Sequence, residues 1–300
     1  MIAEESISNE SKAIASSKVK DYIQLIKFRL SFLVVFSATA TFLLGSSGVI
    51  DWRKLVMLVL GGFMVTGSSN AFNQIIERDL DKLMSRTQKR PLPDNRMEVN
   101  EAFVFSLVMG IVGVFLLGYF VNITCGILGL LALLLYTLLY TPLKKQTPFA
   151  VFVGAFPGAI PPMLGWVAAT GKLDVIAFAL FFIQFIWQFP HFWAIAWVLD
   201  DDYKKAGFKM LPSLGGRDKS SAFQALVYTI CLIPTSLLPF FFHITGIISS
   251  IVIIIAGVFF MMKALKLYKT LDIKAAKELM FGSFIYLPVI QIAMFLDKIN

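Results

Sequence analysis

The chain has 300 residues, of which 57% are apolar and 15% are charged, and its formal net charge is +8. Soluble proteins have roughly 45–50% apolar and about 25% charged residues, so the composition excludes a soluble globule, a secreted disulfide scaffold and a disordered chain. We interpret the positive charge as a marker of membrane topology and not of nucleic-acid binding, because basic residues gather on the cytoplasmic side of membrane proteins.

Seven stretches of the sequence contain no Asp, Glu, Lys or Arg. They cover residues 30–50, 55–76, 102–143, 146–171, 175–199, 220–262 and 279–296. A spanning helix needs about 20 apolar residues, so the two longest stretches are two spans each, with turns near Asn122 and His243. The sequence therefore predicts an all-α membrane protein with nine transmembrane helices around a central cavity.

The distribution of basic residues predicts the orientation of these helices. With a cytoplasmic N-terminus, 23 of the 27 Lys and Arg residues lie on the inside, as expected for membrane proteins. Residues 1–26 are polar and carry acids, unlike a signal or transit peptide. We expect a cytoplasmic tail over residues 1–29 and a nine-helix domain over residues 30–300. The expected location is the bacterial plasma (inner) membrane, with the active site toward the cytoplasm.

Polar side chains recur at the end of the second predicted helix. Asn73, Glu77 and Asp81 are spaced by four residues, which places them on one face of a helix. Two carboxylates and an amide suit a hard cation such as Mg²⁺; the alternative is a solvated helix end. A second acidic cluster, residues 200–202, ends the sixth helix, and both clusters lie on the same side in the nine-span topology.

Basic residues lie close to these acids in the sequence. Six of them follow the second and fourth helices: Arg78, Arg86, Lys89, Arg90, Lys144 and Lys145. They either pair with acids and mark topology, or they bind phosphate oxygens. Together, the acids, a metal and the cations fit a phosphorylated lipid whose tail lies in the apolar bundle.

The fifth and sixth predicted helices carry prolines and a histidine. Pro157, Pro161 and Pro162 lie in the fifth helix, and Pro190 lies in the sixth. A proline frees a backbone carbonyl that a neighbour or a cavity must satisfy, so these helices are either plainly kinked or bent around a substrate. His191 is either a structural residue or a functional one, since a histidine is costly inside a membrane.

Four segments of the sequence carry a family resemblance. They are N-A-F-N-Q-I-I-E-R-D-L-D-K-L-M-S-R-T-Q-K-R-P-L-P at 70–93, Y-T-P-L-K at 140–144, G-A-I-P-P-M-L-G-W at 158–166, and W-Q-F-P-H-F-W-A-I-A-W at 187–197, which continues into D-D-D-Y-K-K-A-G-F-K-M-L-P at 200–212. Together they resemble the UbiA-type membrane prenyltransferases, most closely the protohaem IX farnesyltransferase (haem O synthase) branch.

The resemblance implies a reaction and its participants. A farnesyl group passes from farnesyl diphosphate to a vinyl group of haem B, with addition of water, to give haem O and diphosphate for haem–copper oxidase assembly. The implied cofactor is Mg²⁺. The implied surroundings are the lipid bilayer, with a downstream haem-modifying enzyme as a candidate partner and no nucleic acid.

The resemblance also implies roles for individual residues. The expected metal ligands are Asn73, Glu77, Asp81 and Asp202. The expected diphosphate contacts are Arg86, Arg90 and Lys144. The expected catalytic residues are Glu77, Asp81, Asp202 and Lys144. The haem or acceptor side is expected at His191 and Tyr140.

The sequence departs from the superfamily pattern at three positions. Glu77 stands where Asp is usual, and Ala150 stands where an Asp or Asn often follows the motif lysine. Val198 replaces the usual acid four residues before Asp202. The second metal-binding motif therefore has fewer matching residues than the first, and fewer residues support the assignment of Asp202.

Two other functions remain open from the sequence. One is a UbiA-type enzyme with a quinone precursor or a chlorophyll-type ring as acceptor, although the Trp-Gln-Phe-Pro-His segment at 187–191 fits the haem branch. The other is a membrane transporter, suggested by the prolines and by weak similarity between two halves. A transporter would place polar groups at mid-membrane, whereas almost all the acids here lie at helix ends.

Overall fold

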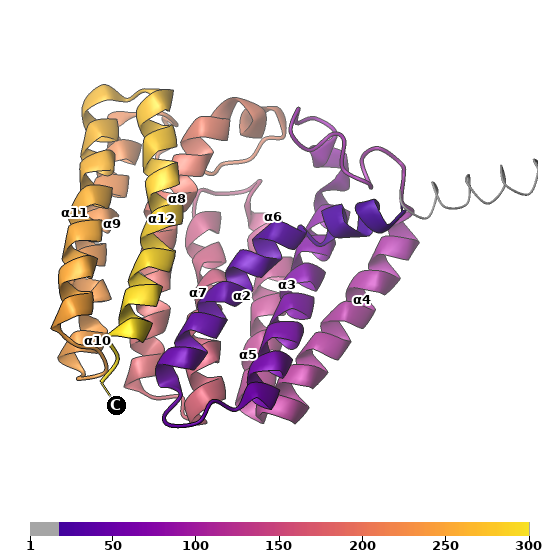
Figure 1. The fold of residues 1–300 in the computed structure, drawn as a ribbon. Coiled ribbons are helices and arrows are strands. Elements are labelled where there is room, and N and C mark those ends of the chain that lie inside the picture. Colours follow the sequence, from indigo (N-terminus) through magenta and orange to yellow (C-terminus); the bar gives the residue numbers. More distant parts are fainter. Residues whose placement is uncertain (1–17, 300) are drawn as a thin grey trace, which may run out of the picture.

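The computed structural model describes residues 18–299, and the regular elements in that part of the chain are helices (Figure 1). Residues 18–25 form a short helix before α2. The elements that follow are α2 (Phe28–Gly45), α3 (Trp52–Asp81), α4 (Val99–Phe115), the π-helix η1 (Leu116–Val121), α5 (Ile123–Leu134), the π-helix η2 (Leu135–Tyr140), α6 (Thr141–Leu143), α7 (Ala150–Thr170), α8 (Val175–Lys205), α9 (Lys219–Ser236), α10 (Leu238–Phe241), α11 (Ile247–Thr270) and α12 (Ile273–Leu296).

Nine helical spans within residues 18–299 are long and apolar enough to cross a membrane, which confirms the predicted number. Three spans join consecutive elements: α4 with η1, α5 with η2 and α6, and α9 with α10. Both predicted turns are found. The Asn122 side chain begins α5 by accepting a hydrogen bond from the Cys125 backbone N–H at 2.8 Å. His243 lies between α10 and α11 with a φ of 57°.

Successive spans run in opposite directions along the bundle. The loops 82–98, 144–149 and 206–218 therefore lie at one end of it, the upper end in Figure 1, which we call the loop face. This arrangement confirms the prediction that the second and sixth spans, α3 and α8, end on the same side.

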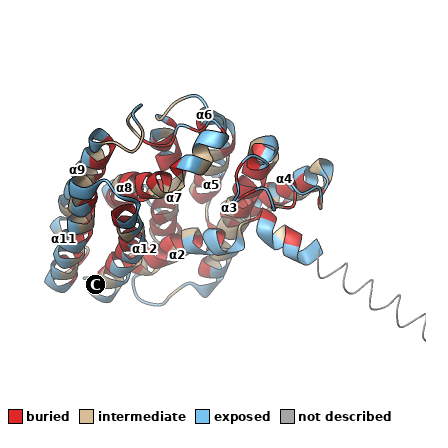
Figure 2. Ribbon diagram, turned by 90° about the horizontal axis from the view of Figure 1, so that it is seen from above, coloured by how far each residue is buried: buried red, intermediate tan, exposed pale blue. Residues whose placement is uncertain are grey.

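The bundle is elongated when it is seen from the loop face (Figure 2). Helices α9 and α11 lie at one end of it and α3, α4 and α5 lie at the other, with α2, α7, α8 and α12 between them. The most buried spans are α7 and α8. The middle of the bundle is thus the packed part, and its ends expose more apolar surface, as expected for helices that face lipid.

Helix α7 is continuous although three prolines lie inside it. Pro162 has no N–H to donate to the Gly158 carbonyl, and the Gln184 side chain of α8 donates to that carbonyl instead, at 2.7 Å. Gln188, one turn further along α8, donates to the Ala155 carbonyl at 2.9 Å. Side chains of α8 therefore supply the hydrogen bond that the proline removes, as membrane helices require.

Residues 18–25 are tied to the loop face by several side chains. Asp21 forms an ion pair with Arg96, and Lys18 forms one with Glu101 at 2.9 Å. Gln74 of α3 donates to the Leu25 carbonyl at 2.7 Å. These contacts fix the start of α2 against α3 and α4.

Helices α2 and α7 approach each other closely at Gly165. A Cβ atom there would collide with the Ala38 carbonyl and the Thr41 hydroxyl of α2. The backbone of α2 cannot move aside as the end of a flexible side chain can, so position 165 requires glycine. The two helices pack at backbone contact, which small residues permit in membranes.

We predict that Gly165→Ala lowers stability by about 1–3 kcal/mol, because the added methyl group must push α2 away from α7. Thermal unfolding in detergent measures the change. Gly62→Ala on α3 is the matched control, since its Cβ would meet only Val35, at 3.6 Å. Equal melting temperatures for the two variants would contradict the close approach.

Candidate active site

Three oxygen-bearing side chains form a buried row on one face of α3, near the loop face. Asn73, Glu77 and Asp81 are 1%, 4% and 0% exposed. Asp79 points to another face, where it is exposed and pairs with Lys82 at 3.0 Å. The alternative of a solvated helix end therefore applies to Asp79 and not to the row.

Two cations from separate parts of the chain meet the acidic row. Lys144, which follows α6, lies with its Nζ 2.9 Å from Oε1 of Glu77. Arg90, in the loop 82–98, donates from a terminal guanidinium nitrogen to Oδ2 of Asp81 at 2.7 Å. Each carboxylate thus has a cation of its own. Buried charges are stable inside a protein only when each one is paired and hydrogen-bonded in this way.

The π-helix η2 brings aromatic rings to the same cluster. The rings of Tyr136 and Tyr140 lie 5.1 Å apart, and the Lys144 ammonium lies 4.7 Å from the centroid of the Tyr140 ring. Gly154 of α7 leaves room for Tyr140, since a Cβ there would lie 2.5 Å from the ring. π-helical turns are frequent at functional sites, and this one places Tyr140 beside the cation of the row.

Charge interactions set the ionisation of Lys144. Burial by itself would lower its pKa, but the carboxylate of Glu77 and the neighbouring Tyr136 raise the pKa above the usual lysine value. Lys144 therefore stays protonated at neutral pH. Its contact with Glu77 is an ion pair.

Lys27 also reaches the row, and the sequence analysis missed it. Its Nζ lies 3.4 Å from the Asn73 side-chain oxygen. Burial lowers its pKa well below the usual value, and the charges of Arg90 and Lys144 lower it further. Its backbone is left-handed, with a φ of 48° at the bend before α2. In the sequence it resembled any other topology-marking lysine of the tail, so no pattern distinguished it.

Asp202 lies at the end of α8 and contacts the loop after α3. Its Oδ1 accepts hydrogen bonds from the Ser85 hydroxyl at 2.7 Å and from Lys205 at 2.9 Å. Its Oδ2 accepts one from the Arg86 backbone N–H at 3.3 Å. The structure therefore joins the two acidic regions through this loop, and it does not place Asp202 in direct contact with Glu77 or Asp81.

The other members of the second cluster have partners of their own. Asp200 lies 2.7 Å from Lys204, and Asp201 accepts three hydrogen bonds from Arg217 at 3.1 Å. The Arg86 residue, whose backbone contacts Asp202, is exposed at the loop face. An exposed guanidinium at that position can reach an anion that approaches the row from outside.

His191 lies on α8 away from the acidic row. Its Nδ1 is 2.7 Å from the Ser283 hydroxyl of α12, and its ring stacks on Trp187 with centroids 4.4 Å apart. The structure thus separates the two residues predicted for the acceptor side. Tyr140 lies at the cation cluster, and His191 lies between α8 and α12.

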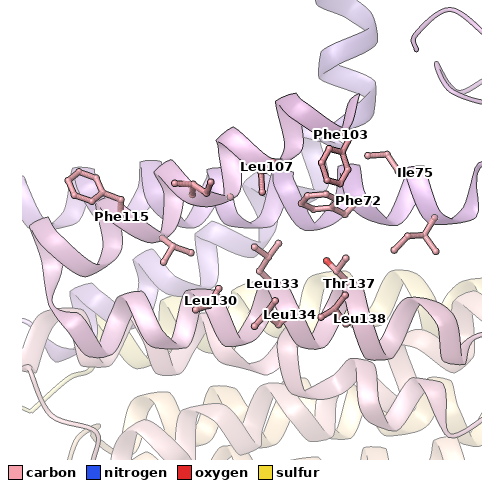
Figure 3. A pocket seen from close by; sticks show the side chains of 14 residues that line it. Phe72, Ile75, Phe103, Leu107, Phe115, Leu130, Leu133, Leu134, Thr137 and Leu138 are labelled. Atoms are coloured by element: carbon pink, nitrogen blue, oxygen red, sulfur yellow. The ribbon is translucent and has the colours of Figure 1, made fainter. Parts of the chain in front are cut away.

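A lateral groove of about 670 Å³ lies between α3, α4, α5 and η2 (Figure 3). Phe72 and Ile76 line it from α3, Leu107 lines it from α4, and Thr137 is the one polar side chain among its lining residues. The groove lies on a different face of α3 from Glu77. It is an apolar surface turned to the lipid and separate from the acidic row.

Comparison with known proteins identifies the family. The family described as the UbiA prenyltransferase family matches residues 33–287. The chain belongs to this family. It is 48% identical to the protoheme IX farnesyltransferase of Cytophaga hutchinsonii, over 95% of this chain and 99% of that protein. It is 47% identical to that of Flavobacterium psychrophilum, over 93% and 94%.

Solved structures share the fold of this UbiA family member. A digeranylgeranylglyceryl phosphate synthase superposes with a TM-score of 0.78 at 24% identity, over 94% of this chain and 98% of the other. A UbiA homologue from Archaeoglobus fulgidus, bound to DMAPP and Mg²⁺, superposes with a TM-score of 0.73 at 16% identity, over 91% and 99%. These likenesses confirm the all-α membrane fold predicted from the sequence, and the central cavity stays a prediction.

The residues of the row fit a hard cation. Oδ1 of Asp81 is buried and has no hydrogen-bond partner in the part of the chain that the structure describes, so one oxygen of the row is free there. In residues 18–299, no three His, Cys, Asp or Glu side chains gather as a metal cluster. Two carboxylates and an amide still match Mg²⁺, which commonly takes one or two protein carboxylates and leaves its other positions to water and phosphate.

We predict that Lys144→Met lowers stability by about 3–5 kcal/mol, because it leaves the Glu77 carboxylate buried without its cation. The double variant Glu77→Gln, Lys144→Met should recover most of that loss, since neither charge then remains. Thermal unfolding in detergent without substrate provides the measurement. If the two changes simply add, Glu77 and Lys144 are not energetically coupled.

Proposed function

We propose that this membrane enzyme transfers a farnesyl group from farnesyl diphosphate to a vinyl group of haem B, with addition of water, to give haem O and diphosphate. Four relatives that are 43–48% identical over at least 93% of this chain carry the name protoheme IX farnesyltransferase. The observation that carries the proposal is the buried row of Glu77 and Asp81 with its two cations, which matches a metal-bound diphosphate.

Asn73, Glu77 and Asp81 would hold Mg²⁺, with Asp202 as the ligand from α8. When bound, the metal neutralises the charge that develops on the leaving diphosphate. Asp202 now binds the backbone of the loop that carries Arg86.

Arg90 and Lys144 would bind the diphosphate. In the structure each of them neutralises one carboxylate of the row. With a metal diphosphate in the site, the two carboxylates would hold the metal and the two cations would bind phosphate oxygens. Arg86 would add a third cation from the loop face. Substrate binding would thus exchange two internal ion pairs for a network in which each charge still has a partner of opposite sign.

The main contribution of the protein to the proposed reaction is electrostatic stabilisation of the departing diphosphate. The bond between C1 and oxygen of farnesyl diphosphate breaks, and its electron pair leaves with the diphosphate. C1 then bonds to the terminal carbon of the haem vinyl group. The cation left beside the porphyrin takes up water and releases a proton. The ring face of Tyr140, next to Lys144, can stabilise positive charge near C1.

The acceptor would lie on the membrane side of the diphosphate, toward His191. We propose the bacterial plasma membrane as the location, with the loop face toward the cytoplasm, because 23 of the 27 basic residues lie on that side of the nine-span topology. Since the farnesyl chain of the product anchors it in the bilayer, a downstream haem-modifying enzyme is the proposed partner.

Glu77→Gln and Asp81→Asn should each lower turnover at least about 100-fold, because each removes a charge that holds the metal diphosphate. Purified variants are incubated with haem B, farnesyl diphosphate and Mg²⁺, and mass spectrometry measures the hydroxyethylfarnesyl adduct. The control is Asp79→Asn, whose exposed carboxylate lies outside the row. Wild-type turnover in both row variants would refute the metal site.

Removal of divalent metal should stop adduct formation in the wild-type enzyme, and added Mg²⁺ should restore it. The assay uses EDTA and then an excess of MgCl₂. Adduct formation that persists in EDTA would contradict the proposed cofactor. An adduct on a quinone precursor but none on haem B would instead indicate another acceptor branch of the family.

A further inference from the structure

A second apolar groove, which we call the α11–α12 groove, lies between two helices that run side by side (Figure 1). Its volume is about 310 Å³. Ala256 and Phe259 line it from α11, and Gly282 and Ile285 line it from α12. Phe259 and Ile285 are exposed, so the groove opens onto the surface that faces lipid.

Charged side chains border one end of the α11–α12 groove. Lys263 lies one turn beyond Phe259 on α11, and Glu278 lies one turn before Gly282 on α12, so both extend the lining faces toward the loop face. The Lys263 ammonium lies 5.0 Å from the centroid of the Phe259 ring. A Cβ atom at Gly282 would lie 3.7 Å from Cγ of Lys263. The stem of Lys263 therefore lies directly at the end of the groove.

Two lysines share a single carboxylate at this end. Nζ of Lys263 lies 3.2 Å from Oε2 of Glu278, and Nζ of Lys266 lies 2.6 Å from Oε1. Residues 263–278 contain three further lysines and one further acid. Glu278 brings the two ammonium groups together but neutralises only one of them. The end of the groove therefore carries an excess of positive charge.

The polar groups along the rest of the two helices are already engaged. Asp297, which follows α12, accepts a hydrogen bond from the Ser249 backbone N–H at 2.7 Å. Lys298 donates to backbone carbonyls at the end of α2. The Tyr286 hydroxyl, the one polar side-chain group that lines the groove, is hydrogen-bonded to Ser236 at 2.9 Å. Within residues 18–299, the α11–α12 groove is thus apolar along its length and bordered by excess positive charge at the loop face.

We propose that the α11–α12 groove and its lysines bind one anionic phospholipid. An acyl chain lies in the groove, and the phosphate lies between the ammonium groups of Lys263 and Lys266. Basic pockets between spanning helices bind anionic headgroups at the cytoplasmic surface, and in the proposed orientation the loop face meets that leaflet. The groove and the acidic row lie at opposite ends of the bundle (Figure 2), so the proposal does not depend on the proposed reaction.

Lipid titration of the purified full-length protein in a neutral detergent, read by native mass spectrometry, tests the proposal. The wild type should bind phosphatidylglycerol at least about 10-fold more tightly than phosphatidylcholine with the same acyl chains, because the choline group cancels the phosphate charge. Equal affinities would overturn the proposal. Inorganic phosphate at the same concentration should not displace the lipid, because it has no chain. Displacement would indicate a phosphate site and would overturn the lipid assignment.

The double variant Lys263→Gln, Lys266→Gln should bind phosphatidylglycerol about 10-fold or more weakly, because both headgroup contacts are lost. Lys269→Gln, Lys277→Gln is the matched control, since these two lysines are exposed and form no ion pair within residues 18–299. Equal losses in the two double variants would show attraction by the whole charged surface and would overturn the site. Glu278→Gln should bind the lipid more tightly than the wild type, since it frees both ammonium groups. Weaker binding in that variant would contradict the proposal.

Filling the groove tests the place of the acyl chain. Ala256→Phe should weaken phosphatidylglycerol binding at least about 10-fold, because displacing about two buried CH₂ groups already has that effect. Val258→Phe is the control, since Val258 is exposed on α11 and does not line the groove. Wild-type lipid affinity in Ala256→Phe would overturn the proposed position of the chain.

Discussion

The site depends on two ion pairs buried at the end of α3, Glu77 with Lys144 and Asp81 with Arg90. Charges in such surroundings are stable only when each has a partner. The partners here are separable, because the carboxylates and the cations come from different elements. A metal and a diphosphate can take the place of both partners without leaving any charge alone, which suits a site that must bind and release a highly charged group.

Separate parts of the fold supply the residues of this cluster. α3 supplies the acids, the segment after η2 supplies Lys144, and the loop 82–98 supplies Arg90. The bend before α2 adds Lys27. The apolar spans exclude water from the same place, which strengthens each electrostatic contact. Binding strength is therefore concentrated at one end of a bundle whose remaining surface is apolar.

Much of this arrangement could be predicted from the sequence. Charge-free stretches gave the nine spans, because membrane helices must be long and apolar. The spacing of Asn73, Glu77 and Asp81 gave a common helix face, because helical periodicity is local. Their pairing with Lys144 and Arg90 depended on tertiary contacts, and the family resemblance implied only that these two cations contact the diphosphate.

The remainder depended on contacts that no local pattern encodes. Lys27 looked like a topology marker, and its approach to Asn73 requires the bend before α2. The motif assigned Asp202 to the metal, but its hydrogen bonds to Ser85 and Arg86 follow from how the loop folds back on α8. Nothing in the sequence predicted that Ser283 would contact His191, since a serine in an apolar helix usually bonds only to its own backbone.

The most direct test of the ion-pair exchange is a crystal structure with Mn²⁺ and inorganic diphosphate, in which anomalous scattering locates the metal. We predict one Mn²⁺ peak bound by Glu77 and Asp81, with Lys144 and Arg90 moved from the carboxylates onto the diphosphate oxygens. A metal located away from both carboxylates, or diphosphate bound while both internal pairs stay closed, would contradict the account.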